Sequence, residues 1–544
     1  MKNNFILKFF IKNKIQLTIF MLLLLGSAIF SAYFSVLLGE IFDIAGTNNY
    51  KSFHILILKT ISSFLIIILF TLFIGIIKSN HIAKIFVFIK SNFIEAVLRK
   101  NISTFKGFKK SEYISVLVND INYIQDLYIA NLFNITENMI KLIVSVITLL
   151  VINLFGTIIV VIFSIIPILL AIAFNKRISL EINKFSRNKG EYTEKTMELL
   201  NGFDTFTISN SKDSAVKLHS QFNINQSETK RKTFTHIEGL SSIIGISAIS
   251  VTIFTLLIGM FLALKGFITI GQVFAISFIS NGISSPLMDL FNIIPQFQGG
   301  KAIIEKYNEF IYENNSAEKV ELGQIKENIV LTNMSIEFDR KILNSINFEI
   351  ELGKKYLLIG ESGSGKSIFL KTILGQFIEY SGEIHINNID IKKIDESSIY
   401  KNISYIPQES FFFQDTIRNN ITLYDDSISE EKIMNVLEFV NMKETILNLP
   451  EKLDTEFNET KSNLSGGEKQ RLSIARSLLS LKPVLFMDES TSALDNANFM
   501  DIENKILNFD KITIVNICHR LKEEIMDRYD KIIKIENGVL EVIK

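Results

Sequence analysis

Long runs of apolar residues alternate with polar segments over the first 300 residues of the chain. A helix needs about 20 mainly apolar residues to cross about 30 Å of hydrocarbon. Six runs meet this requirement, at residues 15–38, 53–77, 133–152, 155–174, 241–264 and 271–294. The pattern therefore predicts an α-helical polytopic membrane domain with six transmembrane helices.

The connections between these spans are of two kinds. Those after the first, third and fifth spans are short and carry few lysines, whereas residues 78–132 and 175–240 are long, polar and richer in Lys and Arg than in Asp and Glu. The excess of positive charge favours the cytoplasm for both long connections, as do the four lysines of residues 1–14 for the N-terminus. Each long connection predicts two cytoplasmic helical extensions.

The predicted extensions turn near residues 103–111 and 202–210. Apolar side chains stand at these turns, where a solvated charged helix would present few of them. They are Phe105, Phe108, Phe203 and Phe206. We expect these tips to dock on a soluble domain.

Composition narrows the class of protein further. The 57 basic and 57 acidic residues balance, which gives no attraction for nucleic acid. The single cysteine, Cys518, cannot form an internal disulfide and suits a reducing cytoplasm. A bias towards Ile, Lys, Asn and Phe without any Trp favours a bacterium, so we expect a multi-pass protein of the bacterial plasma membrane with its soluble domain in the cytoplasm.

The pattern changes after the sixth span. Pro295 and Gly299-Gly300 precede a charged, polar stretch that indicates a linker. From Ile329 onward, short β runs alternate with helical patterns, as in an α/β domain. The predicted organisation is a membrane domain over residues 1–300, a linker over 301–325 and a nucleotide-binding domain over 326–544.

A phosphate-binding loop follows the β run 356–359. Backbone N–H groups of a glycine-rich loop wrap phosphates, the lysine reaches the β and γ phosphates, and the hydroxyl holds Mg²⁺. The candidate ATP-binding residues of this loop are Gly360, Ser362, Gly363, Ser364, Gly365, Lys366 and Ser367. The strand before the loop and the helix after it make a chance match improbable, so ATP and Mg²⁺ are the expected cofactors.

Two acids end a second apolar run, residues 483–489. At the carboxyl edge of a buried strand, Asp488 can bind Mg²⁺ and Glu489 can polarise the attacking water. A plain pair of acids at a strand edge would have the same sequence. Only the combination with Lys366 gives both carboxylates a chemical task.

A third motif separates this chain from other P-loop ATPases. Its residues are Leu464, Ser465, Gly466, Gly467 and Glu468. Followed by Lys-Gln-Arg, they resemble the signature of ATP-binding cassette (ABC) proteins, in which this segment reaches the γ-phosphate held by a second nucleotide domain. Ser465 and two glycines before a helix are also an anion-binding terminus. One chain carries one loop and one signature, so the resemblance implies a dimer.

The resemblance extends to four further positions. Gln408 resembles the Q-loop glutamine, which contacts Mg²⁺; Asp495 resembles the D-loop aspartate at the dimer seam; and His519 resembles the switch histidine that acts in catalysis with Lys366 and Glu489. Phe338 stands where family members often stack adenine on Tyr. The segment before the signature keeps Glu459 but lacks the Gly-Glu-Arg-Gly run common in exporters.

Six spans followed by one cassette resemble an ABC exporter half-transporter. The resemblance implies ATP-driven alternating access in a dimer, with a homodimer favoured and a heterodimer possible. Apart from Lys141 and Asp289, predicted near cytoplasmic ends, the spans carry almost no charge, which favours an amphipathic or hydrophobic substrate such as a peptide, lipid or drug-like molecule. An importer with the exporter fold and an ATP-gated sensor stay open as alternatives.

Overall fold

The computed structural model describes residues 9–11, 13–45, 50–311, 319–337, 341–377, 379–457, 464–519 and 522–544. The chain divides into two compact units. One is helical and comprises Met1–Leu98 and Lys110–Glu313; the other is an α/β unit of Arg99–Lys109 and Asn314–Lys544. The boundaries predicted at residues 300 and 325 stay predictions.

Six helices of the helical unit are long and apolar enough to cross a membrane, among the residues that the structure describes. Five are α2 (Lys14–Ala45), α3 (Tyr50–Leu98), α8 (Leu154–Asn201), α10 (Lys212–Leu264) and α11 (Ile270–Ile311). The sixth is formed by α5 (Lys110–Ser115), η1 (Val116–Asp120), α6 (Ile121–Tyr123), η2 (Ile124–Ile129) and α7 (Ala130–Ile152). The six predicted spans are thereby confirmed as helices, although α2 continues to Ala45, beyond the predicted end of the first span at residue 38.

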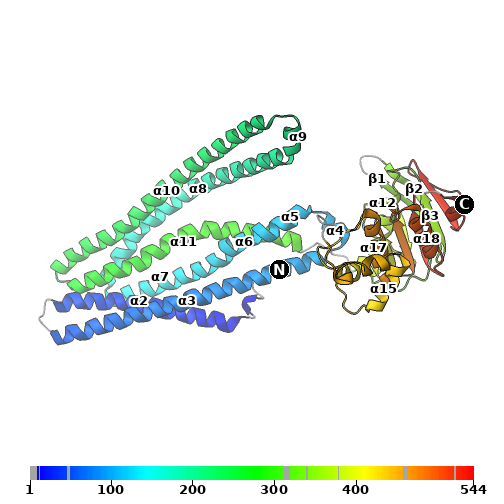
Figure 1. Cartoon of the computed structure of the whole chain (residues 1–544). Coiled ribbons are helices and arrows are strands. Elements are labelled where there is room, and N and C mark those ends of the chain that lie inside the picture. The colour runs from blue at the N-terminus through cyan, green and yellow to red at the C-terminus, as the bar shows by residue number, and fades with distance from the viewer. Residues whose placement is uncertain are drawn as a thin grey trace. The chain divides into compact units, whose positions relative to one another are not determined.

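The two long polar connections continue the membrane helices, as predicted. Helices α8 and α10 run side by side and are joined by the short α9 (Phe203–Ile208) at one end (Figure 1). The 53 residues of α10 correspond to about 80 Å of helix. At the tip, Phe203 is exposed. Docking of this second tip on a soluble domain therefore stays a prediction.

Helix α11 is the most enclosed of the six candidate spans, with 56% of its most apolar window buried. It also continues to Ile311, so the start of the predicted linker is helical. Tertiary contacts stabilise this extension: the buried Tyr307 hydroxyl donates to the Ile89 carbonyl at 3.0 Å. Gly300 lets α11 lie close to the backbone of η2, because a Cβ at this position would lie 2.9 Å from the Tyr128 nitrogen. The local helix-breaking signals of Pro295 and the glycine pair are overridden by this packing.

The α/β unit contains two sheets, of orders β2-β1-β4-β5 and β10-β9-β3-β8-β7-β6. In the second sheet, β9, β3, β8, β7 and β6 are parallel, and β10 pairs antiparallel with β9. The strands are β1 (Ile329–Glu337), β2 (Lys341–Ile350), β3 (Lys355–Ile359), β4 (Ser381–Ile386), β5 (Ile389–Asp390), β6 (Ile403–Ile406), β7 (Val484–Asp488), β8 (Thr513–Ile517), β9 (Lys531–Glu536) and β10 (Val539–Val542). The predicted α/β class is confirmed.

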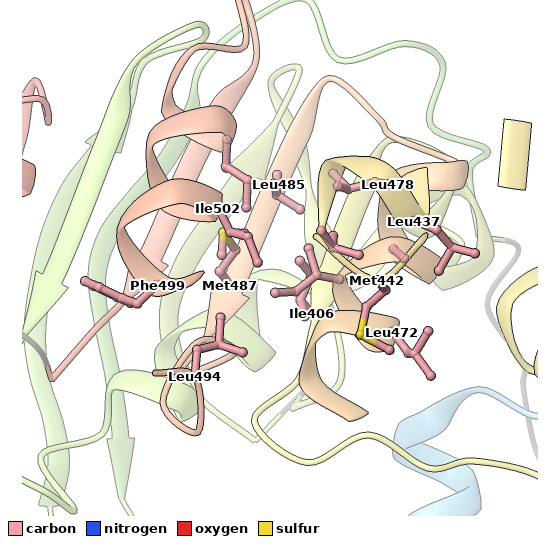
Figure 2. Packing of buried hydrophobic residues seen from close by; sticks show 14 of the residues in the cluster. Ile406, Leu437, Met442, Leu472, Leu478, Leu485, Met487, Leu494, Phe499 and Ile502 are labelled. Carbon is pink, nitrogen blue, oxygen red and sulfur yellow. The ribbon is translucent and has the colours of Figure 1, made fainter. Parts of the chain in front are cut away.

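Helices cover the parallel sheet. They are α12 (Lys366–Ile373), α13 (Glu396–Tyr400), α14 (Ile417–Thr422), α15 (Glu430–Phe439), α16 (Lys443–Leu447), α17 (Gly466–Leu479), α18 (Asn496–Leu507) and α19 (Glu523–Met526). Apolar side chains of the sheet and of these helices form two clusters, and in one of them Leu485 and Met487 of β7 lie among Leu437, Leu472 and Ile502 (Figure 2). A strand buried on all its residues, such as β7, reads as a continuous apolar run.

The short helix α4 (Ile102–Lys106) belongs to the α/β unit. The Ile102 N–H donates to the Glu396 Oε1 at 3.3 Å, and the Tyr400 hydroxyl donates to the same oxygen at 2.5 Å. The Lys106 ammonium lies 6.0 Å from the centre of the Phe377 ring. Burial raises the pKa of Glu396 and lowers the pKa of Lys106. Docking of the first predicted tip is therefore confirmed.

Candidate nucleotide site

The loop between β3 and α12 is shaped by glycines. Gly360, Gly363 and Gly365 adopt φ angles of +153°, +82° and +98°, which other residues rarely adopt. Gly365 caps the N-terminus of α12 without a side-chain hydrogen bond. A Cβ at Gly365 would also lie 2.9 Å from Ile342 Cγ2. The loop and the helix start therefore present backbone N–H groups and a positive dipole end to an anion.

Lys366 crosses this loop from the first turn of α12. Its ammonium donates to the Gly360 carbonyl at 2.8 Å and to the Glu361 carbonyl at 2.7 Å, and the residue is buried. Burial lowers the pKa of Lys366, while the nearby Glu489 and Asp488 act in the opposite direction. A phosphate in the loop would add the negative charge that this desolvated cation lacks.

Asp488 ends β7 with both carboxylate oxygens engaged. The Ser367 hydroxyl donates to Oδ1 at 2.7 Å and the Tyr405 hydroxyl donates to Oδ2 at 2.9 Å. Burial and the Asp488 carboxylate raise the pKa of Tyr405, which keeps this phenol a donor. The pair Ser367 and Asp488 supplies neighbouring oxygen ligands of the kind that Mg²⁺ prefers. Their chemistry fits the predicted metal.

Glu489 lies between two other predicted site residues. Its Oε1 is 2.7 Å from the His519 Nε2, and its Oε2 accepts from the Gln408 Nε2 at 2.8 Å. Its backbone has a φ of +50°, a conformation that is costly for this residue type and clusters at functional sites. A hydrogen bond from the Glu489 N–H to the Ile517 carbonyl, 3.1 Å, anchors it. The residues are positioned by β6, β7 and β8, which are neighbours in the sheet.

The signature residues make their polar contacts at the start of α17. The Glu468 N–H donates to the Ser465 Oγ at 3.3 Å, and the Ser465 N–H donates to the Glu468 carboxylate at 2.7 Å, which forms a capping box. Gln470 binds the following loop, since its Oε1 accepts from the Ala493 N–H at 2.7 Å. Within the described part of the chain, these contacts of Ser465 and Glu468 do not reach the phosphate loop.

Asp495 caps α18 by accepting from the Ala497 and Asn498 N–H groups at 3.0 and 2.9 Å. The hydrogen bond from the Asn498 side chain is the main cause of its lowered pKa. Asp495 therefore has a structural task in its own chain, and its place at a dimer seam stays a prediction. Phe338 and Glu459, which the sequence analysis also names, lie outside the described residues.

The structure contains a buried polar network that no sequence motif indicated. Glu503 of α18 is fully buried and accepts from Asn516 at 3.0 Å, Thr491 at 3.1 Å and Tyr529 at 3.3 Å. Thr491 follows Glu489 by two residues, and Asn516 precedes His519 by three. The network thus joins the segments that position both. A Glu on an amphipathic helix gave no signal, because its partners come from distant elements.

We expect replacement of Glu503 to reveal this network in stability measurements. Burial raises the pKa of Glu503, and this effect outweighs the three hydrogen bonds to the carboxylate, which lower the pKa. The Glu503 carboxylate therefore binds a proton more tightly in the folded chain than in the unfolded chain. Stability therefore falls as pH rises above the unfolded pKa of about 4. Glu503→Gln should remove that fall, whereas Glu503→Ala should cost about 1–3 kcal/mol by leaving buried donors unpaired.

Thermal unfolding of the full chain in detergent, at about pH 5 and about pH 8, measures both effects. The exposed Glu524 provides the matched control, Glu524→Gln, which should follow the wild type at both pH values. An identical pH dependence for wild type and Glu503→Gln would contradict the prediction.

The fold and the site together define a membrane protein that carries a P-loop nucleotide-binding domain. Family models agree: residues 17–287 match the ABC transporter transmembrane region, and residues 343–492 match the ABC transporter domain. The two matches cover most of the chain, and the chain belongs to the ABC transporter family. It is a multi-pass membrane protein with an ATP-binding domain.

Characterised and uncharacterised relatives support this assignment. The chain is 30% identical over 390 residues to the uncharacterised ABC transporter ATP-binding protein YwjA of Bacillus subtilis, which covers 70% of this chain and 67% of that protein. It is 30% identical to the lactococcin-A transport/processing ATP-binding protein LcnC of Lactococcus lactis, over 63% of this chain and 48% of that protein. It is 28% identical to the microcin-J25 export ATP-binding/permease protein McjD of Escherichia coli, over 65% of this chain and 63% of that protein.

The chain thus matches about half to two thirds of the length of these relatives. A solved structure of a bacterial Atm1-family ABC exporter with ATP bound superposes with a TM-score of 0.84. It covers 97% of this chain and 95% of its own, at 21% sequence identity. The fold of the chain is that of this exporter.

Proposed function

We propose that the chain is an ATP-driven transporter of the exporter type, working by alternating access as half of a dimer. One observation carries the proposal: the Glu489 carboxylate is hydrogen-bonded to both Gln408 and His519. Glu489 follows Asp488 directly, and the domain that holds them is fused to six candidate membrane spans. An intact hydrolytic set on a membrane domain favours transport over a sensor, for which a degraded set would suffice.

Each side chain of the site has a proposed task. Lys366 and the loop N–H groups bind the β and γ phosphates, and Ser367, Asp488 and Gln408 hold Mg²⁺. The metal, when bound, neutralises charge on the phosphates. Glu489 accepts a proton from the attacking water, and His519, 2.7 Å away, orients the Glu489 carboxylate and contacts the γ-phosphate.

The proposed partner is a second half-transporter. The start of α17, with Ser465 as its cap, is a helix terminus of the kind that binds anions. Among the described residues, the polar contacts of Ser465 and Glu468 stay within this terminus and do not reach the phosphate loop of the same chain. We propose that it serves the ATP held by the partner. Because this chain carries all the expected catalytic residue types, a homodimer is favoured and a heterodimer is the alternative.

The proposed substrate is amphipathic or hydrophobic. The relatives include proteins named for transport of lactococcin A and export of microcin J25, and an ATP-dependent lipid A-core flippase of Syntrophus aciditrophicus. These names, together with bacterial sources, support a peptide or lipid substrate and a location in the bacterial plasma membrane. The nucleotide-binding domain then faces the cytoplasm.

Flux through reconstituted vesicles tests the function. The purified full chain is placed in liposomes, and ATP is added outside to address the outward-facing nucleotide domains. A fluorescent hydrophobic peptide and a fluorescent lipid are the probes. Export predicts ATP-dependent accumulation of a probe inside, absent in Glu489→Gln. Efflux of a preloaded probe would overturn the direction in favour of an importer, and hydrolysis without movement of either probe would favour the sensor.

A further inference from the structure

The side chain of Glu503 lies at a core position of α18. The residue is 1% exposed, and its neighbours Phe499 and Ile502 on the same helix belong to the apolar cluster that also holds Met487 of β7 (Figure 2). An apolar side chain would pack at this position without the cost of removing a carboxylate from water. The packing of α18 does not require an acid here, so its presence is explained by the groups that it binds.

One of these groups belongs to the turn that begins at the proposed base. The Thr491 hydroxyl donates to the Glu503 Oε1 at 3.1 Å, and Thr491 is itself buried. The Ser492 N–H donates to the Glu489 carbonyl at 3.1 Å, so Thr491 lies within a turn whose first residue is Glu489. Glu489 has a φ of +50°, and a strained backbone persists only where its surroundings hold it. Glu503 supplies one such contact through Thr491.

A second group belongs to the strand that leads to His519. The Asn516 amide donates to both oxygens of Glu503, at 3.0 and 3.2 Å. Asn516 lies on β8, and the carbonyl of the next residue, Ile517, accepts the Glu489 N–H at 3.1 Å. His519 follows two residues later. One carboxylate therefore binds both chain segments whose ends meet in the 2.7 Å contact between Glu489 and His519.

The third partner, Tyr529, fixes the orientation of the carboxylate. Its hydroxyl donates to the Glu503 Oε2 at 3.3 Å and accepts from the Asn516 amide at 2.8 Å. Both carboxylate oxygens are thereby bonded. Among the hydrogen bonds of the described residues, none joins Glu503 to the phosphate loop or to the side chain of the proposed base. An effect of Glu503 on hydrolysis must therefore pass through Thr491 and Asn516.

We propose that Glu503 is a positioning residue for ATP hydrolysis. Acting through Thr491 and Asn516, its side chain holds Glu489 in place. The inference rests on the proposed function, in which Glu489 is the base. A displacement of about 1 Å at a reacting group can cost about 10²-fold in rate, so loosening the turn after Glu489 lowers kcat. The phosphate loop lies outside the network, and the KM for ATP therefore stays unchanged.

Steady-state hydrolysis by the full chain in detergent tests the proposal. Glu503→Ala removes the bonds to both segments, and we expect kcat to fall by about tenfold with the KM for ATP unchanged. Glu503→Gln should recover most of the lost rate, because its amide oxygen can accept from both Thr491 and Asn516. Thr491→Val keeps the volume of the side chain and removes a single bond, so kcat should fall by about threefold with less risk to the fold.

Leu507→Ala is the matched control. Leu507 is buried in the same apolar cluster, four residues after Glu503 on α18, and its side chain has no polar group. This substitution should lower the thermal unfolding temperature and leave kcat at the wild-type value. Three results would each overturn the proposal: wild-type kcat in Glu503→Ala, an equal fall of kcat in Leu507→Ala, or a fall that Glu503→Gln does not reverse.

Failure of the positioning role is distinct from failure of the proposed function. The positioning role fails when Glu503→Ala hydrolyses ATP like the wild type. The transport function fails when the wild type hydrolyses ATP in vesicles without moving either probe, a result that leaves the comparison of kcat values intact.

Discussion

Replacing Glu489 by Gln is expected to lower ATP hydrolysis by about 10²–10⁴-fold while ATP binding persists. An amide keeps the shape of the side chain and can still bond with Gln408 and His519, whose present contacts are 2.8 and 2.7 Å. It cannot accept the proton of the attacking water. The phosphate loop and the Ser367 to Asp488 bond are left intact, so affinity for ATP should change little.

Two measurements separate the effects of Glu489→Gln. Phosphate release by the full chain reports hydrolysis, and titration with a fluorescent ATP analogue reports binding. Glu444→Gln is the matched control, since Glu444 is exposed on α16 of the same domain, and it should hydrolyse ATP like the wild type. Near-normal phosphate release by Glu489→Gln would refute the proposed base. Loss of ATP binding would instead indicate that the substitution disturbs the phosphate loop.

The geometry around Glu489 follows from chain order and sheet topology. Gln408, Glu489 and His519 each stand just beyond the carboxyl end of a strand, and the three strands β6, β7 and β8 are adjacent and parallel. Ligand sites in such sheets lie at this edge. Short motifs in the sequence could therefore predict which residues meet, because each motif is attached to a recognisable apolar strand.

Other features could not be predicted, because they depend on packing between distant segments. Glu503 gave no signal, since Asn516 and Tyr529 reach it only in the folded domain. The helical path beyond Pro295 depends on the Tyr307 bond to the Ile89 carbonyl, which outweighs a local breaker. Periodicity locates helices but not which faces meet.

A mixed dimer of two inactive variants is expected to regain ATP hydrolysis. Lys366→Ala removes the cation that binds the phosphates, and Ser465→Asp places a negative charge where the signature would meet the partner's triphosphate. Asp is a good N-cap, so the start of α17 should persist. Each variant alone makes a homodimer with two defective sites. In the mixed dimer both defects fall in one composite site, and the other site is wild type.

Differently tagged chains, co-expressed and purified through both tags, give the mixed dimer. If the two sites act independently, its phosphate release should be about half that of a doubly tagged wild type. A site built within a single chain predicts the opposite: each protomer would carry its own defect, and mixing would restore nothing. Hydrolysis by a strict monomer would lead to the same conclusion. The test therefore depends on which chain supplies Ser465 to the ATP held by Lys366, whatever substrate the membrane domain carries.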